Sequence, residues 1–246
     1  MISRDDLIHY LNDYLKIDEF SDYGPQGLQV EGKSEVQTIV TGVSASVQLF
    51  EKAVQAGADM IIVHHGILWD RDSHVIKGGF KNRIKVLLEN EITLLCYHLP
   101  LDKHAEIGNN AVIAKKLGLS NLEEFGDVGI QGQIEETELQ SLLKTIQDTI
   151  KSDPLVFAYG PEKISKIAIC SGSAQKEITI AIENGADVFI TGEVSEPTMH
   201  IAREGNIHFI AAGHYATETF GIKALGDHIE KKYNVPVNFI DVPNPV

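Results

Sequence analysis

An internal repeat limits the folds that this chain of 246 residues can adopt. Residues 41–46 and 57–62 correspond to residues 169–174 and 185–190, and both pairs of segments are separated by the same 128 positions (41 to 169, and 57 to 185). Each first segment has the pattern of a strand that enters a helix, and each second segment leads into a buried strand. A unit of strand, helix and strand therefore occurs twice. The repeat predicts two similar α/β halves with right-handed crossovers between parallel strands.

Apolar periodicity predicts the elements that complete each half. Helices are expected over residues 3–16, 47–56, 81–90, 109–117, 137–150 and 217–233, and strands over 36–44, 60–63, 92–97, 128–134, 155–159 and 207–212. The glycines and proline of residues 22–32 predict a structured loop. The fold class is α/β, with mixed, largely parallel sheets flanked by helices. We expect the first half over residues 1–125 and the second over 126–246, with the C-terminal helix packing on either half.

Composition excludes several classes of partner. The net charge of −14 argues against a nucleic-acid backbone or an anionic membrane as the main partner. No apolar run approaches the roughly 18 residues of a membrane span, and the first residues lack the apolar core of a signal peptide. The two cysteines, Cys96 and Cys170, lie inside apolar runs, which predicts buried free thiols. We therefore expect a cytoplasmic protein.

Imidazoles and carboxylates follow the predicted strands. Open α/β sheets bind ligands outside the carboxyl ends of their strands, so these side chains are expected to gather. They are His64, His65, His98, Asp102, His214 and Glu218. Six such groups are too many for one tetrahedral ion and suit two divalent ions about 3.5–4 Å apart, which we expect between the halves. Ligands without thiolate fit Zn, Fe, Mn, Co or Ni, and the sequence does not choose among these metals.

Other polar residues near these strand ends have two interpretations each. His98, His74 and Glu193 are candidates for proton transfer or for contact with a ligand. The alternative interpretation is that they are ordinary loop residues exposed to solvent. Serines at 44, 46, 171 and 173 enter helices, where capping is favoured over an anion site. Trp69 and Tyr215 flank the candidate ligands, where they line a pocket or only pack.

Four motifs together resemble one family over nearly the whole chain. The motifs are Gly27–Val30, Val63–Gly66, His98–Asp102 and Gly213–Glu218, and they resemble the GTP cyclohydrolase I type 2 homologues, also called Nif-three-like proteins. The resemblance implies a di-metal site formed by His64, His65, Asp102, His214 and Glu218, with His98 beside it. It also implies the short form of the family, without an inserted domain, and a toroidal homohexamer. The family name implies opening of the purine ring of GTP.

Two classes of function follow from these observations. The first is a metal-dependent hydrolase that acts on a nucleotide or a related heterocycle through metal-bound hydroxide. The second is a non-catalytic metal-binding protein, which would be a scaffold, a metal carrier or a partner-binding regulator. A metal site that only stabilises the oligomer is a third possibility, and its ions would have no open coordination position. Family membership predicts the metal site better than the substrate, and we favour the hydrolase.

Overall fold

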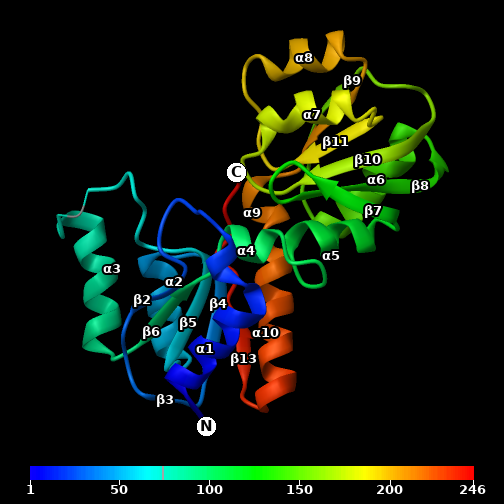
Figure 1. Cartoon of the computed structure of the whole chain (residues 1–246). Helices are drawn as coiled ribbons and strands as arrows, with labels where there is room; N and C mark the ends of the chain where they lie inside the picture. The colour runs from blue at the N-terminus through cyan, green and yellow to red at the C-terminus, as the bar shows by residue number, and fades with distance from the viewer. Residues whose placement is uncertain (74) are drawn as a thin grey trace. The chain divides into compact units, whose positions relative to one another are not determined.

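The computed structural model describes residues 1–73 and 75–246, and the candidate residue His74 lies outside the described residues (Figure 1). The chain forms two compact units, one of residues 1–101 with 222–242 and one of residues 102–221 with 243–246. The sequence repeat divides the chain at residue 125, whereas the compact units divide it at residues 101 and 221. The C-terminal helix from Ile222 onward belongs to the first unit.

The first unit is built on a five-stranded sheet of order β13-β4-β5-β6-β2. Its strands are β2 (Gly27–Val30), β4 (Ile39–Ser44), β5 (Met60–His65), β6 (Thr93–Cys96) and β13 (Val237–Phe239), and β1 (Ile2–Ser3) pairs with β3 (Glu35–Val36) apart from this sheet. Strands β13, β4, β5 and β6 are parallel, while β2 is antiparallel to β6. Because β5 lies in the middle, it is buried on both faces and is continuously apolar from Met60 to Val63.

Helices cover this sheet where the apolar periodicity places them. They are α1 (Arg4–Leu15), the 3-10 turn η1 (Ile17–Glu19), α2 (Val47–Gln55), α3 (Gly78–Glu89), the start of α4 (Leu99–Asp102) and most of α10 (Thr219–Tyr233). The side chain of Ser3 accepts a hydrogen bond from the N–H of Asp6 and caps α1 as expected. Helices α2 and α3 pack through Leu49, Phe50 and Leu87 onto one apolar cluster of the sheet.

The second unit is built on a six-stranded sheet of order β7-β8-β10-β11-β12-β9. Its strands are β7 (Ser120–Phe125), β8 (Gly129–Thr137), β9 (Leu155–Ala158), β10 (Ile164–Cys170), β11 (Val188–Thr191) and β12 (His208–Ala211), and its helices are α5 (Asn109–Lys116), α6 (Leu139–Ile150), η2 (Gln175–Glu177), α7 (Ile178–Glu183), α8 (Thr198–Glu204) and α9 (His214–Thr217). Strands β10, β11 and β12 are parallel, and β8 and β9 run antiparallel to their neighbours. Helices α5 and α6 cover one face and α7 and α8 the other (Figure 1).

The expected repeat is present in both units. Each unit has three parallel strands, β4-β5-β6 in the first and β10-β11-β12 in the second, and a crossover helix joins the first two strands of each triplet, α2 in the first unit and α7 in the second. Gly57 and Gly185 end these crossovers with φ of 68° and 69°, a backbone conformation that favours glycine. The fold class of two similar α/β halves with mixed sheets is therefore confirmed.

The loop expected over residues 22–32 contains a strand that the sequence reading missed. Residues Gly27–Val30 form β2 at the edge of the first sheet, with an irregular register against β6. A short edge strand pairs on one side only, so its alternation of apolar and polar residues is weak. Strands β7 and β13 were missed for the same reason, whereas the edge position of Leu155–Ala158 is confirmed.

The expectation of two buried free thiols is also met. Cys96 and Cys170 are buried and not in a disulfide. Burial raises the pKa of the Cys96 thiol to about 12, which disfavours the thiolate that a nucleophile or metal ligand requires. Across residues 1–73 and 75–246, no helix has both the length and the apolar character needed to cross a bilayer.

Candidate functional site

His64 and His65 are the last two residues of β5, the central strand of the first unit. We expected them just beyond the strand, because successive strand residues point to opposite faces. That expectation was wrong, yet the two ring centroids lie 4.7 Å apart. The pairing of β5 with β6 ends at Val63, so both histidines lie beyond the last pair on that side. His64 is fully buried and His65 is partly exposed.

His98 brings a third imidazole to the same place. It follows β6 and immediately precedes α4, and its ring centroid lies 5.1 Å from that of His64 and 5.5 Å from that of His65. Each of the three residues offers a ring nitrogen, and these nitrogens all lie within 4.8 Å of one another. Three convergent imidazoles are a common ligand set for a divalent transition metal.

Each of these rings is oriented by an oxygen at its Nδ1 atom. The Nδ1 atom of His64 donates to the carbonyl oxygen of Tyr97 at 2.9 Å, and a 3.1 Å hydrogen bond joins Nδ1 of His65 to Oγ of Ser44. Because a carbonyl only accepts, Nδ1 of His64 carries a proton, and in the neutral imidazole Nε2 is then the atom available to a metal. Histidines that bind metals show this arrangement, in which the other nitrogen bonds to an oxygen that fixes the ring.

Asp22 orients His98, and sequence reasoning missed it. Its Oδ1 atom accepts from Nδ1 of His98 at 2.8 Å, and its Oδ2 atom accepts from the N–H of Leu99 at 2.9 Å. Burial acts to raise the pKa of Asp22, but hydrogen bonding to His98 and to main-chain N–H groups outweighs it, and the pKa is lowered. The only sequence signal was an acidic residue at the start of a glycine- and proline-rich segment.

The same segment fixes the main chain around the histidines. Oε1 of Gln26 accepts from the N–H of His98 at 2.7 Å, and Oε1 of Gln29 accepts from the N–H of Ile67 at 2.7 Å. A Cβ atom on Gly66 would lie 2.3 Å from Oε1 of Gln29, so a larger residue at position 66 would displace that amide. The Gly-Leu-Gln-Val motif therefore supports the His-His-Gly motif.

The second unit holds the carboxylates. Asp102 ends α4 and is 4% exposed, while Glu218 follows α9 and is 3% exposed. Their ligand oxygens lie within 4.8 Å of each other. Oδ1 of Asp102 accepts from Nδ2 of Asn109 at 2.8 Å and from Oγ of Ser171 at 3.1 Å. Two buried carboxylates this close repel each other when both are ionised, and a bound cation offsets that repulsion.

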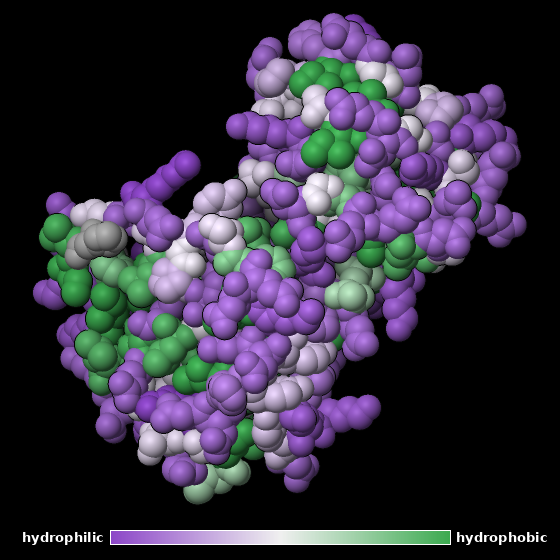
Figure 2. Space-filling view, viewed as in Figure 1, coloured by the Kyte–Doolittle hydropathy of each residue, from purple (hydrophilic) through white to green (hydrophobic). Residues whose placement is uncertain are grey.

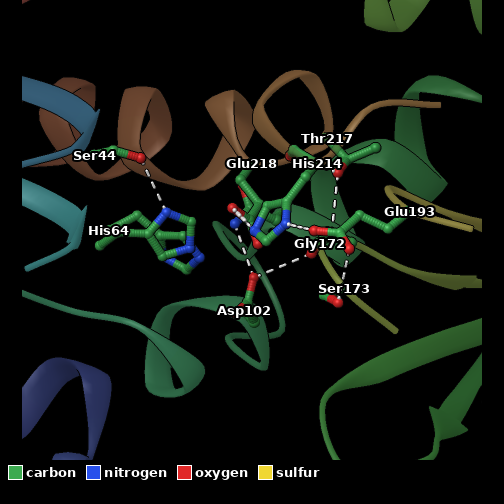
Figure 3. A network of polar contacts seen from close by, with 12 residues as sticks. Ser44, His64, Asp102, Gly172, Ser173, Glu193, His214, Thr217 and Glu218 are labelled. Carbon is green, nitrogen blue, oxygen red and sulfur yellow. Dashed lines mark hydrogen bonds and ion pairs between the residues drawn. The ribbon is translucent and has the colours of Figure 1, made fainter. Parts of the chain in front are cut away.

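His214 lies between two carboxylates of the same unit (Figure 3). Its Nδ1 atom donates to Oε1 of Glu193 at 2.6 Å, and its Nε2 atom lies 3.0 Å from Oε2 of Glu218. Burial acts to lower the pKa of His214, but Glu218 and Glu193 together outweigh it and raise the pKa to about 9. Glu193 thus has the relation to His214 that Asp22 has to His98. A metal ion at Nε2 would take the place of the proton that His214 otherwise holds.

Gly172 brings the main chain against this pair. Its φ is 69°, and a Cβ atom there would lie 2.3 Å from Oε1 of Glu218 and 3.4 Å from Nε2 of His214. The N–H of Gly172 donates to Oγ1 of Thr217 at 3.1 Å, which fixes the loop to α9. Only a glycine fits between β10 and these ligand-type side chains.

The serines at the helix entrances were expected to be caps, and one of the four is. Ser46 accepts from the N–H of Leu49 and caps α2. Ser44 instead bonds to His65, Ser171 to Asp102 and Ser173 to Glu193. The capping interpretation was wrong for these three, because ligand-type side chains compete for their hydroxyl groups.

Both units offer donor types that divalent metals prefer. The first unit offers three convergent imidazoles whose other nitrogens are bonded to oxygens. The second offers His214 with the buried carboxylates of Asp102 and Glu218. The predicted metal ligands and His98 therefore fall into two ligand sets, and Glu193 bonds directly to His214 of the second. We call them the histidine set (His64, His65 and His98) and the carboxylate set (Asp102, His214 and Glu218).

Known proteins resemble the chain over its whole length. The family model described as Duf34/NIF3 (NGG1p interacting factor 3) matches residues 2–245. A Haemophilus influenzae protein named GTP cyclohydrolase 1 type 2 homolog is 46% identical over 246 residues, which is 98% of each chain. The solved structure of the protein ybgI, described as of unknown function, has a TM-score of 0.96 at 44% identity and covers 100% of both chains. That of TTHA1606 from Thermus thermophilus has a TM-score of 0.94 at 36% identity over the same coverage.

Proposed function

The chain belongs to the Duf34/NIF3 family, and we propose that it is a metal-dependent hydrolase that acts on a nucleotide or a related heterocycle. It would bind about two divalent ions per chain through His64, His65, Asp102, His214 and Glu218, with His98 beside them. The observation that carries the proposal is the convergence of His64, His65 and His98 with an oxygen at each Nδ1 atom. Divalent ions held this way act as Lewis acids and lower the pKa of water.

The chain's own residues would position the ligands and move protons. Ser44 and the carbonyl of Tyr97 hold the rings of His65 and His64, and Glu193 holds that of His214. Asp22 and His98 form a carboxylate–imidazole pair, which is suited to accept a proton from a nucleophile or pass one to a leaving group. The name GTP cyclohydrolase 1 type 2 homolog, borne by relatives, makes GTP the first substrate to assay.

Metal content and turnover measured together test the proposal. Wild type, His65→Ala and Glu218→Gln would be purified without chelator, their metals measured by mass spectrometry, and hydrolysis of a panel of nucleotides assayed. We expect about two ions in the wild type, and loss of metal and turnover together in both variants. His9→Ala is the matched control, because the side chain of His9 is 82% exposed on α1. Full turnover by metal-free protein would contradict the proposal.

A non-catalytic role is the second candidate. The family description contains the words "NGG1p interacting factor", which name a protein interaction. In this case the chain would be a metal-binding scaffold, a metal carrier or a regulator that binds a partner. Two tightly bound ions with no turnover of any nucleotide in the panel would favour it over the hydrolase.

The homohexamer implied by the family resemblance is part of the proposal. Light scattering on the eluting protein should give six times the chain mass of 27.0 kDa. The monomer mass would contradict the hexamer and leave the metal proposal unaffected.

A reducing cytoplasm is the proposed location, since both thiols are buried and not in a disulfide.

A further inference from the structure

A cavity of about 430 Å³ lies in the first unit, beside the histidine set. Pro25, Ile67, Trp69 and Phe80 form apolar parts of its lining, and Phe80 comes from α3. Figure 2 shows hydrophobic residues gathered at the surface over α3. The volume and the mostly apolar walls are those of a site for a small molecule.

Trp69 connects this cavity to the histidines. Its ring system makes a T-shaped contact with His98 with centroids 5.3 Å apart, and its centroid lies 6.2 Å from that of His65. The indole is partly exposed and lines the cavity. A planar ring that packs against Trp69 would therefore lie next to the imidazoles.

Arg83 gives the cavity a positive group. Its Nη1 atom donates to the carbonyl oxygen of Ala45 at a long 3.4 Å, and its guanidinium lies 6.0 Å from the centre of the Phe80 ring. Its Nε atom is buried and has no hydrogen-bond partner among the described residues. Because Arg83 lines the cavity, its guanidinium can donate N–H bonds to an anionic oxygen there, and Lys77 adds a second positive charge to the lining.

The acidic residues of the lining favour a ligand that also carries hydrogen-bond donors. Asp70 and Asp72 line the cavity, and the N–H of Asp70 donates to the carbonyl oxygen of Tyr23 at 2.8 Å. A carboxylate accepts hydrogen bonds from ring N–H or amino groups. The lining thus combines an aromatic wall, a cation and an acceptor of N–H bonds.

We propose that this cavity binds a planar heteroaromatic molecule that carries N–H donors and one anionic group, as a purine nucleoside monophosphate does. The ring packs against Trp69, the anionic group pairs with Arg83, and ring N–H groups face Asp70. If the protein is the proposed hydrolase, this ligand is its substrate. The binding of the ligand itself does not depend on that function. Occupation of the cavity needs no metal.

Trp69 reports on the cavity directly, because it is the only tryptophan of the chain. Guanosine 5′-monophosphate would be titrated into chelator-treated full-length protein while indole emission is followed, with equilibrium dialysis as a second measurement. Guanosine is the matched probe without the anionic group. We expect the monophosphate to change the emission and to bind at least about tenfold more tightly than guanosine.

Variants of α3 separate the role of Arg83 from general charge. Arg83→Gln should bring the affinity for the monophosphate down to that for guanosine, and Arg83→Lys should retain part of the preference. Lys81→Gln is the control, because Lys81 lies on the same helix but does not line the cavity. Thermal unfolding of each variant establishes that it is folded.

The outcomes separate this inference from the metal proposal. Equal binding of the two probes, no binding of the monophosphate by dialysis, or unchanged affinity in folded Arg83→Gln would overturn the inference about the cavity. Metal content and turnover measured on the same samples would still test the metal proposal, because that proposal depends on the histidine set and the carboxylate set. Conversely, tight binding of the monophosphate by protein that takes up no metal would support the inference about the cavity and contradict the proposal of a metal-dependent hydrolase.

Discussion

Asp59 and Asp187, which the repeat places 128 positions apart, make the same hydrogen bonds in the two units. Oδ2 of Asp59 accepts from the N–H groups of Gln37 and Thr38 at 2.9 and 3.3 Å. Oδ2 of Asp187 accepts from the N–H groups of residues 165 and 166 at 2.8 and 2.9 Å. Each aspartate joins the start of one parallel strand to the start of its neighbour, so the repeated Gly-Ala-Asp sequence is structural.

Asp59→Asn should destabilise the chain by about 1–2 kcal/mol at pH 7, because charged hydrogen bonds to two N–H groups are weakened. Burial acts to raise the pKa of Asp59, but the N–H of Gln37 and the ammonium of Lys33 outweigh it, and the pKa is lowered. A carboxylate whose pKa is lowered by folding stabilises the fold at any pH above its unfolded pKa of 3.8. This stabilisation is lost as the pH falls through the pKa of the folded state.

Urea unfolding at pH 7 and pH 3 measures this effect. The difference between wild type and Asp59→Asn should shrink at pH 3, and Asp148→Asn, at an exposed position, should unfold like wild type. A difference that grows at low pH would show that the charge of Asp59 does not stabilise the fold.

Asp22→Asn should weaken metal binding by about 10–100-fold, the usual effect of removing an outer partner of a metal site, because Asp22 fixes the ring of His98 beside the proposed ligands. The change should have no further effect in a His98→Ala background, because Asp22 acts through His98. Competition with a chromogenic chelator measures the affinity in the four proteins of this double-mutant cycle. Additive losses would mean that Asp22 acts elsewhere, and Asp18→Asn, on an exposed residue of the same region, is the control.

Gly172→Ala should cost more stability than Gly185→Ala and should also lose metal. Both glycines have φ of 69°, but a Cβ atom at 172 meets Glu218, whereas nothing lies within 4 Å of one at 185. The strain of a positive φ, about 1 kcal/mol or more, is therefore common to both variants and cancels in the comparison. Thermal unfolding and metal content measure the remainder. Equal losses would show that Glu218 adapts to the added methyl group.

Removing the metal should lower the unfolding temperature of the wild type. A ligand at 100 times its dissociation constant stabilises a fold by about 2.7 kcal/mol, and each kcal/mol shifts the midpoint of a chain of this size by about 2–4 °C. Calorimetry with and without a chelator should show this shift in the wild type and not in Glu218→Gln. A similar shift in Glu218→Gln would place the stabilising metal elsewhere.

The sequence predicted what is local or repeated. The parallel triplets, the cap at Ser3 and the ligand-type residues after each strand follow from periodicity and from the repeat. It did not predict the pairing of Asp22 with His98, because that contact joins residues 76 positions apart and neither residue type signals the other. Edge strand β2 was missed because one-sided pairing leaves little pattern, and the serines were misread because capping is only one use of a hydroxyl group.

The strand β13 has a consequence for the order in which the molecule is made. It pairs in parallel with β4, so residues 237–239 complete a sheet whose other strands end at Cys96. The second unit is nearly continuous, since residues 102–221 supply almost all of it. A ribosome therefore delivers nearly all of the second unit before the first has its last strand. The sheet of the first unit therefore waits for its last strand until after residues 102–221 are made, and until then the edge of β4 is open to other partners.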